Sequence, residues 1–233
     1  MIAIKKTDIF ENATTLLLFS LIFFEIIATM MSFEVVQFAF RPSVIVLILY
    51  LYWRTSTARN ILFFVPFVFL LVTSVCILFK DQYIVMIGLI SVAIHRIMLI
   101  YFIIKLNKIK DFIPILIAIV PFISIFSHLL YLADEIPARS FYPLVIQNVL
   151  VSVFAAVVLS NYFMNKNSNT AWLSIFGLLS TSLYFIVFIE KCFLSSLPPT
   201  YFTPVGMILF ASSYYAFYKL VRESERTNTY QTS

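Results

Sequence analysis

Long apolar runs separated by short polar joins dominate the pattern along the chain. A membrane-spanning helix needs roughly 20 mostly apolar residues. Such a run must be helical, because each backbone polar group inside a bilayer has to be hydrogen-bonded within the segment. The pattern therefore predicts an all-α, single-domain bundle of about eight transmembrane helices. The predicted spans are 12–33, 41–54 (a short run), 60–79, 82–104, 112–132, 141–163, 171–190 and 201–221.

Composition supports a membrane protein and excludes a soluble one. The chain has 233 residues, of which 62% are hydrophobic and 12% are charged. An ordinary soluble domain is about 25% charged, and a soluble protein of this size cannot bury so much apolar surface. The first apolar run has no small-residue cleavage site after it, so we expect it to remain as the first span.

Lysine and arginine are divided unequally between the two predicted sides of the membrane. Cytoplasmic loops carry the excess of these residues, which predicts that both termini are cytoplasmic, in the bacterial inner membrane. The net charge of +5 follows from this bias, so we expect no nucleic-acid partner. The eleven residues on the richer side are Lys5, Lys6, Arg54, Arg59, Lys105, Lys108, Lys110, Lys166, Lys219, Arg222 and Arg226; the four on the other side are Arg41, Lys80, Arg139 and Lys191.

Two charged residues lie deep inside predicted spans. Ionisable side chains at such depth are rare and usually face the interior of the bundle. Glu25 in the first span and Arg96 in the fourth each lie about 12 Å from a span end, at a rise of about 1.5 Å per residue. This depth allows an ion pair between them. The alternative, in which Arg96 extends to the inner headgroups and Glu25 is protonated or hydrated, stays open.

Polar side chains in several spans predict an intramembrane cavity. His95 lies on a narrow polar strip of its helix with Ser91, and histidine inside a membrane requires a hydrogen-bonding partner. We expect Ser74, His95, Asn148, Thr181 and Tyr214 to line this cavity. Small and hydroxyl-bearing residues also serve to pack helices closely. That alternative stays open for the run at 171–190.

Other site chemistries find no support in the sequence. Two histidines and two separated cysteines, Cys76 and Cys192, provide no metal-ligand spacing. The three glycines form no phosphate-binding loop, and no nucleophile elbow of the GxSxG type occurs. We therefore expect no metal and no cofactor. These patterns name no catalytic residue.

Three segments resemble the YhhN family of lysoplasmalogenases. They are "FRPSVIVLILYLYW" at 40–53, "IHRIMLIYF" at 94–102 and "SYYAFYKLV" at 213–221. The segment "FYPLVIQNVLVSVFAAV" is weakly similar to the sixth span of the family. The resemblance implies eight spans with cytoplasmic termini and a lysophospholipid partner in the membrane. It also implies hydrolysis of a vinyl ether, in which aspartates of spans three and seven act as acid and base.

The chain differs from the family at those aspartates. Counting from His95 without gaps places the third-span position at Thr73-Ser74, and the seventh-span segment "FGLLSTSLYF" contains no acid. A serine does not transfer protons as a carboxylic acid does at neutral pH. Replacement acids would have to be Glu25 or Glu190. The alternatives are a family member without catalysis, a small transporter and a scaffold without a ligand.

Overall fold

The computed structural model describes residues 2–31, 34–56, 58–76, 79, 81–107, 109, 111–133, 138–164, 168–194 and 202–231. This part of the chain forms eight α-helices and no strand, which confirms the all-α class. The helices are α1 (Ile2–Met30), α2 (Glu34–Thr55), α3 (Ile61–Cys76), α4 (Gln82–Leu106), α5 (Ile113–Leu132), α6 (Ala138–Met164), α7 (Ser168–Cys192) and α8 (Thr203–Gln231).

Each predicted run overlaps one helix, although three helices extend beyond their apolar runs. α1 begins at Ile2, α2 begins at Glu34 and α8 continues to Gln231. The sequence of these extensions contains polar residues such as Lys5 and Glu34, which is why the predicted apolar runs do not include them. Of the predicted spans, residues 32–33, 77–78 and 201 lie outside the described part of the chain.

Helix length and composition indicate a membrane protein. Five helices of the described chain, α1, α4, α5, α6 and α7, are long and apolar enough to cross a bilayer. The apolar helix α3 is shorter than a typical span. The crossing of the membrane by all eight helices therefore stays a prediction.

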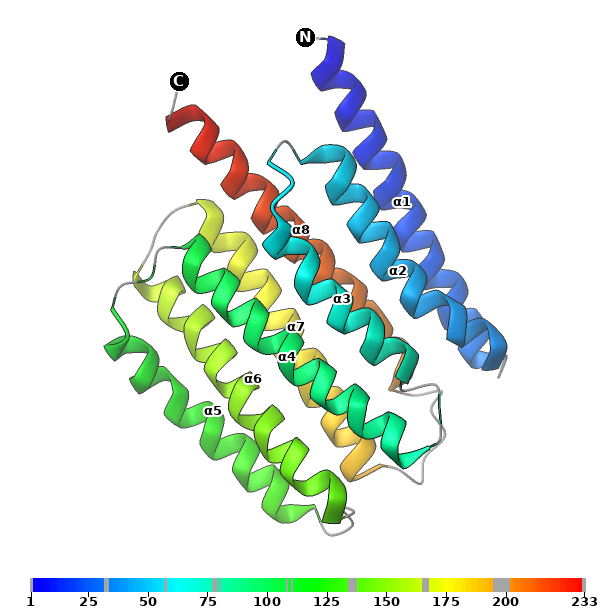
Figure 1. Cartoon of the computed structure of the whole chain (residues 1–233), viewed down its shortest axis with the longest axis vertical. Helices are drawn as coiled ribbons and strands as arrows, with labels where there is room; N and C mark the ends of the chain where they lie inside the picture. The colour runs from blue at the N-terminus through cyan, green and yellow to red at the C-terminus, as the bar shows by residue number, and fades with distance from the viewer. Residues whose placement is uncertain are drawn as a thin grey trace.

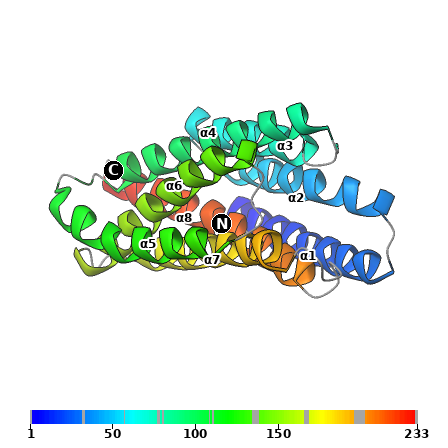
Figure 2. The same ribbon diagram turned by 90° about the horizontal axis from the view of Figure 1, so that it is seen from below.

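Seven helices form a closed ring. α1, α2, α3 and α4 pack one against the next, α4 packs against α6, and α6, α7 and α8 lead back to α1. α5 packs on α6 outside this ring, at the opposite side of the molecule from α1 (Figure 1). Viewed from below, α2, α3 and α4 lie on one side of the bundle, and α1 and α7 lie on the other (Figure 2). The ring thus encloses an interior to which α5 does not contribute.

Both chain termini lie at the same end of the bundle (Figure 1). We call this the terminal end and its opposite the loop end. Arg54 in the last turn of α2 and Arg59 just after this helix lie at the terminal end, whereas Arg41 and Lys191 lie towards the loop end, as the charge pattern predicts. Lys80, Lys108, Lys110 and Lys166 lie outside the described residues, as do the side chains of Lys5, Lys6 and Arg139.

Aromatic rings fill the interior of the ring towards the terminal end. Phe63 stacks on Phe217 with centroids 5.3 Å apart, and Tyr52 stacks on Phe63 at 3.8 Å. Phe176 and Phe67 complete this aromatic core, and all five side chains are fully buried. Each aromatic pair contributes about 0.5–1.5 kcal/mol beyond its buried area. The aromatic core closes the terminal half of the ring.

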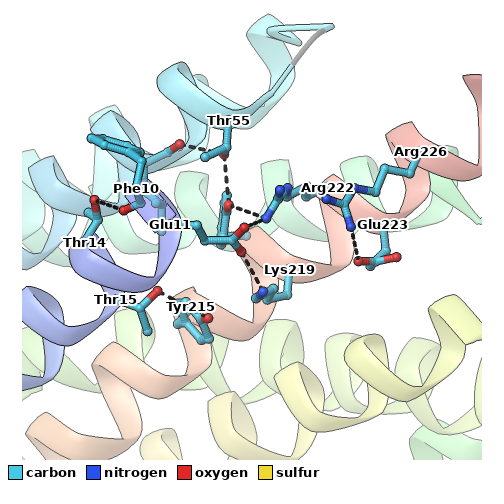
Figure 3. A network of polar contacts seen from close by, with 12 residues as sticks. Phe10, Glu11, Thr14, Thr15, Thr55, Tyr215, Lys219, Arg222, Glu223 and Arg226 are labelled. Atoms are coloured by element: carbon cyan, nitrogen blue, oxygen red, sulfur yellow. Dashed lines mark hydrogen bonds and ion pairs between the residues drawn. The ribbon is translucent and has the colours of Figure 1, made fainter. Parts of the chain in front are cut away.

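A buried cluster of charges joins α1 to α8 beside the aromatic core. Glu11 lies between Lys219 and Arg222 (Figure 3). Lys219 Nζ lies 2.6 Å from Glu11 Oε1, and Arg222 pairs with the other carboxylate oxygen. Arg222 also donates to the Tyr218 hydroxyl, which bonds Thr55 of α2 at 2.9 Å. We call Glu11, Lys219 and Arg222 the charge clamp.

Candidate functional site

A cavity of about 210 Å³ lies inside the ring, towards the loop end. All seven ring helices contribute to its wall, and α5 contributes no wall residue. Much of the wall is apolar, with Leu70, Leu99 and Phe154 as examples. The charged residues of the wall are Glu25, Arg41, Arg96 and Glu190. The cavity thus combines charged and apolar surfaces inside a bundle of apolar helices.

The cavity extends from the helix ends to the middle of the bundle. Thr203, the first residue of α8, and Tyr214, eleven residues further along, both belong to its wall. At 1.5 Å per residue this separation corresponds to about 16 Å. Glu190 near the end of α7 lies in the outer part, and His95 and Arg96 in the middle of α4 lie in the inner part.

His95 is held by two hydrogen bonds that determine its tautomer. Its side chain is buried, and Nδ1 lies 2.7 Å from the carbonyl oxygen of Pro66. A carbonyl oxygen only accepts, so Nδ1 carries a proton. In the neutral imidazole Nε2 then accepts from the Tyr214 hydroxyl, 2.8 Å away. α3, α4 and α8 are thereby joined at the inner end of the cavity.

Arg96 lies over an aromatic ring that is itself fixed from behind. The guanidinium carbon is 4.4 Å from the centre of the Tyr184 ring, which is the geometry of a cation–π contact. The Tyr184 hydroxyl donates to Asn148 Oδ1 at 2.5 Å, and Asn148 Nδ2 donates to the carbonyl of Phe126 at 3.3 Å. Asn148 therefore orients Tyr184, which in turn supports Arg96.

Glu25 is a buried carboxylate with incomplete hydrogen bonding. It is 2% exposed, and its Oε1 has no hydrogen-bond partner among the described residues. Arg41, also on the wall, attracts the carboxylate electrostatically. Within the described part of the chain no ion pair joins Glu25 to Arg96. The two charges share the cavity without contacting each other.

Glu190 has partners at the outer part of the cavity. Thr203 Oγ1 donates to Glu190 Oε1 at 3.3 Å, and Lys191 Nζ lies 3.8 Å from the same oxygen. The Lys191 side chain is largely exposed, so this pair is weak. Glu190 is thus a carboxylate with access to the cavity and a nearby compensating charge.

The structure brings together three of the five residues expected to line the cavity. Ser74, His95 and Tyr214 belong to its wall. Asn148 is buried behind Tyr184, and Thr181 is not a wall residue although its neighbour Ser180 is. A rotation of one residue about the helix axis, about 100°, separates Ser180 from Thr181.

Sequence reasoning missed Arg41, Glu190 and Tyr184 as wall residues. Arg41 and Glu190 lie at the ends of predicted runs, where charges normally only mark the membrane boundary. The structure places Arg41 deeper than the predicted run does, because α2 begins at Glu34 and Arg41 lies seven residues further along, on the same cavity wall as Glu25. Tyr184 lies on a helix with several polar positions, and only the rotation of that helix selects it.

The described residues contain no group of three or more histidine, cysteine, aspartate or glutamate side chains that could hold a metal ion. The wall instead offers two carboxylates, two guanidinium groups and the imidazole of His95. Such groups can bind the polar part of an amphiphile, and a carboxylic acid can also donate a proton.

Comparison with known proteins provides no family assignment. The resemblance to the YhhN family therefore stays a prediction from the quoted segments. No family model, curated protein or solved structure matches the chain.

Proposed function

We propose that the chain is an eight-span protein of the bacterial inner membrane, with both termini in the cytoplasm, and that its cavity binds a single-chain lipid such as a lysophospholipid. The observation that carries this proposal is the cavity itself, which places four charged side chains and an apolar wall inside a ring of apolar helices. Charged groups within a membrane are costly, and they mark sites of function.

The size of the cavity favours a ligand with one chain. Pockets for drug-sized ligands usually have volumes of about 300–1,000 Å³. The cavity holds about 210 Å³, which is roughly seven times the volume of a water molecule in the liquid. It has room for a small headgroup together with the adjacent part of one alkyl chain. A phospholipid with two chains would not fit.

A second candidate function is hydrolysis of a lysolipid vinyl ether. It is favoured by Glu25 and Glu190, which line the same cavity although neither occupies the position of a family aspartate. In this reaction a carboxylic acid protonates the vinyl carbon, and water adds to the carbon that carries the ether oxygen. The resulting hemiacetal breaks into a fatty aldehyde and an alcohol. Glu25 is the better proton donor because Oε1 is unpartnered among the described residues.

Lipid mass spectrometry of the purified protein tests the binding proposal. We expect single-chain lipids to be enriched in the protein sample relative to the membranes from which it was extracted. Val44→Phe adds volume to the cavity wall and should remove this enrichment. Val46→Phe, two residues along on the exposed face of α2, is the matched control and should retain it. Equal enrichment in both variants would contradict binding in the cavity.

Release of fatty aldehyde from a lysoplasmalogen tests the second candidate. We expect Glu25→Gln to abolish release, because the amide cannot donate the proton. Glu223→Gln, at the terminal end, should leave it unchanged. If the wild-type protein releases no aldehyde above background, hydrolysis is excluded and the binding proposal is unaffected.

Cysteine labelling tests the proposed orientation. In a background with Cys76 and Cys192 replaced by serine, Lys191→Cys should react with a membrane-impermeant maleimide in intact spheroplasts. Ala58→Cys, in the exposed connection between α2 and α3, should react only after lysis. The reverse pattern would place the termini outside, and labelling of both positions in intact spheroplasts would contradict an arrangement with all helices crossing.

A further inference from the structure

The charges on the cavity wall do not balance one another locally. Arg41 has the Glu25 carboxylate nearby, and Glu190 has Lys191. These two pairs account for three of the four charged residues on the wall. The fourth, Arg96, lies in the inner part of the cavity, in the middle of α4.

Arg96 has no anionic partner in the described part of the chain. The guanidinium makes no ion pair with Glu25 or Glu190, and its contact with Tyr184 is through the face of the ring. Two tyrosine hydroxyls interact with it electrostatically, and both are already hydrogen-bonded to other residues. Tyr184 donates to Asn148, and Tyr214 donates to His95.

The protein nevertheless holds Arg96 in this position. Tyr184 is buried and hydrogen-bonded to Asn148, which is hydrogen-bonded in turn to the backbone of α5. The stabilisation that a cation–π contact provides is smaller than the cost of an uncompensated charge inside a membrane. A fixed guanidinium that faces a cavity without a counter-ion is suited to an anion supplied from outside the protein.

We propose that Arg96 is the anion-binding group of the cavity and that it binds the carboxylate or phosphate of a single-chain amphiphile. This inference rests on the proposed function and deepens it, because it names the charge of the ligand and the residue that recognises it. A guanidinium offers several donors in one plane and matches the two oxygens of a carboxylate or phosphate. The apolar wall residues, such as Leu70 and Leu99, then accommodate the adjacent part of the alkyl chain.

A series of ligands with one chain length and different headgroups tests this inference. The purified protein in a neutral maltoside detergent is titrated with dodecanoate, dodecyl phosphate, dodecanol and dodecylamine. Binding is followed by native mass spectrometry and by the midpoint of thermal unfolding. We expect the two anionic compounds to bind the wild-type protein about tenfold more tightly than dodecanol, and dodecylamine to bind more weakly than dodecanol.

Variants of Arg96 test whether this residue is the source of the preference for anionic compounds. Arg96→Gln should remove it, so that dodecanoate and dodecanol bind equally, and Arg96→Lys should retain part of it. Without ligand, Arg96→Gln should unfold at the same temperature as the wild type or higher, because a charge without a counter-ion is lost. A purely structural arginine would lower the unfolding temperature instead. Arg54→Gln, exposed at the terminal end, is the matched control and should retain the full preference.

Four results would overturn the inference. The first is that Arg96→Gln keeps the preference for anionic compounds, and the second is that Arg41→Gln loses this preference while Arg96→Gln does not. The third is equal binding of dodecanoate and dodecanol to the wild type. The fourth is binding of acetate or inorganic phosphate as tightly as their dodecyl counterparts. In all but the last, binding of amphiphiles would still support the proposed function. Failure of every dodecyl compound to bind would count against the proposed function itself.

Discussion

At the scale of single residues, the polar groups around the cavity are of two kinds: some have hydrogen-bonding partners in the protein, and others have none among the described residues. His95 is bonded through both ring nitrogens, and Tyr184 is fixed by Asn148. Glu25 Oε1 and the Arg96 guanidinium have no hydrogen-bonding partner among the described residues. The bonded groups join helices, whereas the other two are available to a ligand. Burial alone would not distinguish these roles, because Glu25 and His95 are equally buried.

The hydrogen bond between His95 and Tyr214 predicts a coupled loss of stability. His95→Leu should lower the free energy of unfolding by about 1–2 kcal/mol, because interhelical polar contacts in membranes contribute about 0.6 and at most about 1.7 kcal/mol and the Tyr214 hydroxyl loses its acceptor. Tyr214→Phe should have a similar effect. The double variant should lose less than the sum of the two, as measured by unfolding in detergent. Additive losses would contradict a direct contact.

At the scale of the helices, close approach is controlled by small residues. An added Cβ at Gly177 of α7 would lie only 2.4 Å from Val158 Cγ1 of α6. Gly206 of α8 is different, since its nearest neighbour would be Leu183 at 4.0 Å. The expectation that small residues of the run at 171–190 serve helix packing is therefore confirmed for Gly177. The two glycines form a matched pair for experiment.

Gly177→Ala should destabilise the protein by about 1–3 kcal/mol, the usual cost of overpacking a core. Gly206→Ala should leave stability unchanged or raise it by up to about 1 kcal/mol, because alanine is the better helix former. Combining Gly177→Ala with Val158→Ala should recover much of the loss by restoring space. The comparison uses the midpoint of thermal unfolding. Equal midpoints for the two single variants would show that α6 and α7 are not in close contact.

The sequence predicts the position of each helix along the chain better than it predicts the rotation of that helix about its own axis. Apolar runs are long enough to identify each helix, but a cavity wall is selected by rotation about the axis. α7 carries Ser174, Gly177, Ser180, Thr181 and Tyr184 on one face, within an arc of about 120°. Ser180 and Thr181 lie at opposite edges of this arc, so the pattern does not show which of the two faces the cavity. Ser74 and His95 were predictable because few other polar residues compete on α3 and α4. Arg41 was not, since charges at run ends are common.

At the scale of the whole molecule, the ring has a closed half and an open half. The aromatic core of Tyr52, Phe63, Phe67, Phe176 and Phe217 fills the terminal half, and the cavity occupies the other. The charge clamp was not predictable from sequence, because Lys219 and Arg222 are typical of cytoplasmic helix ends. Only the closure of α1 on α8 shows that Glu11 compensates them. The arrangement suggests that the clamp keeps the ring closed at the terminal end.

The charge clamp therefore predicts that loss of the Glu11 carboxylate lowers the stability of the protein strongly. Glu11→Ala should lower the free energy of unfolding by about 3 kcal/mol or more, because it removes the carboxylate that the buried Arg222 and the partly buried Lys219 share. Glu223→Ala removes a carboxylate whose ion pair with Arg226 is exposed, and should cost less than about 1 kcal/mol. Unfolding of both variants in the same detergent provides the comparison. Since the clamp joins the first and last helices, Glu11→Ala should also expose α1 to limited proteolysis before the remaining helices unfold. Equal stability of the two variants, with α1 protected in both, would mean that the aromatic core alone holds the ring closed.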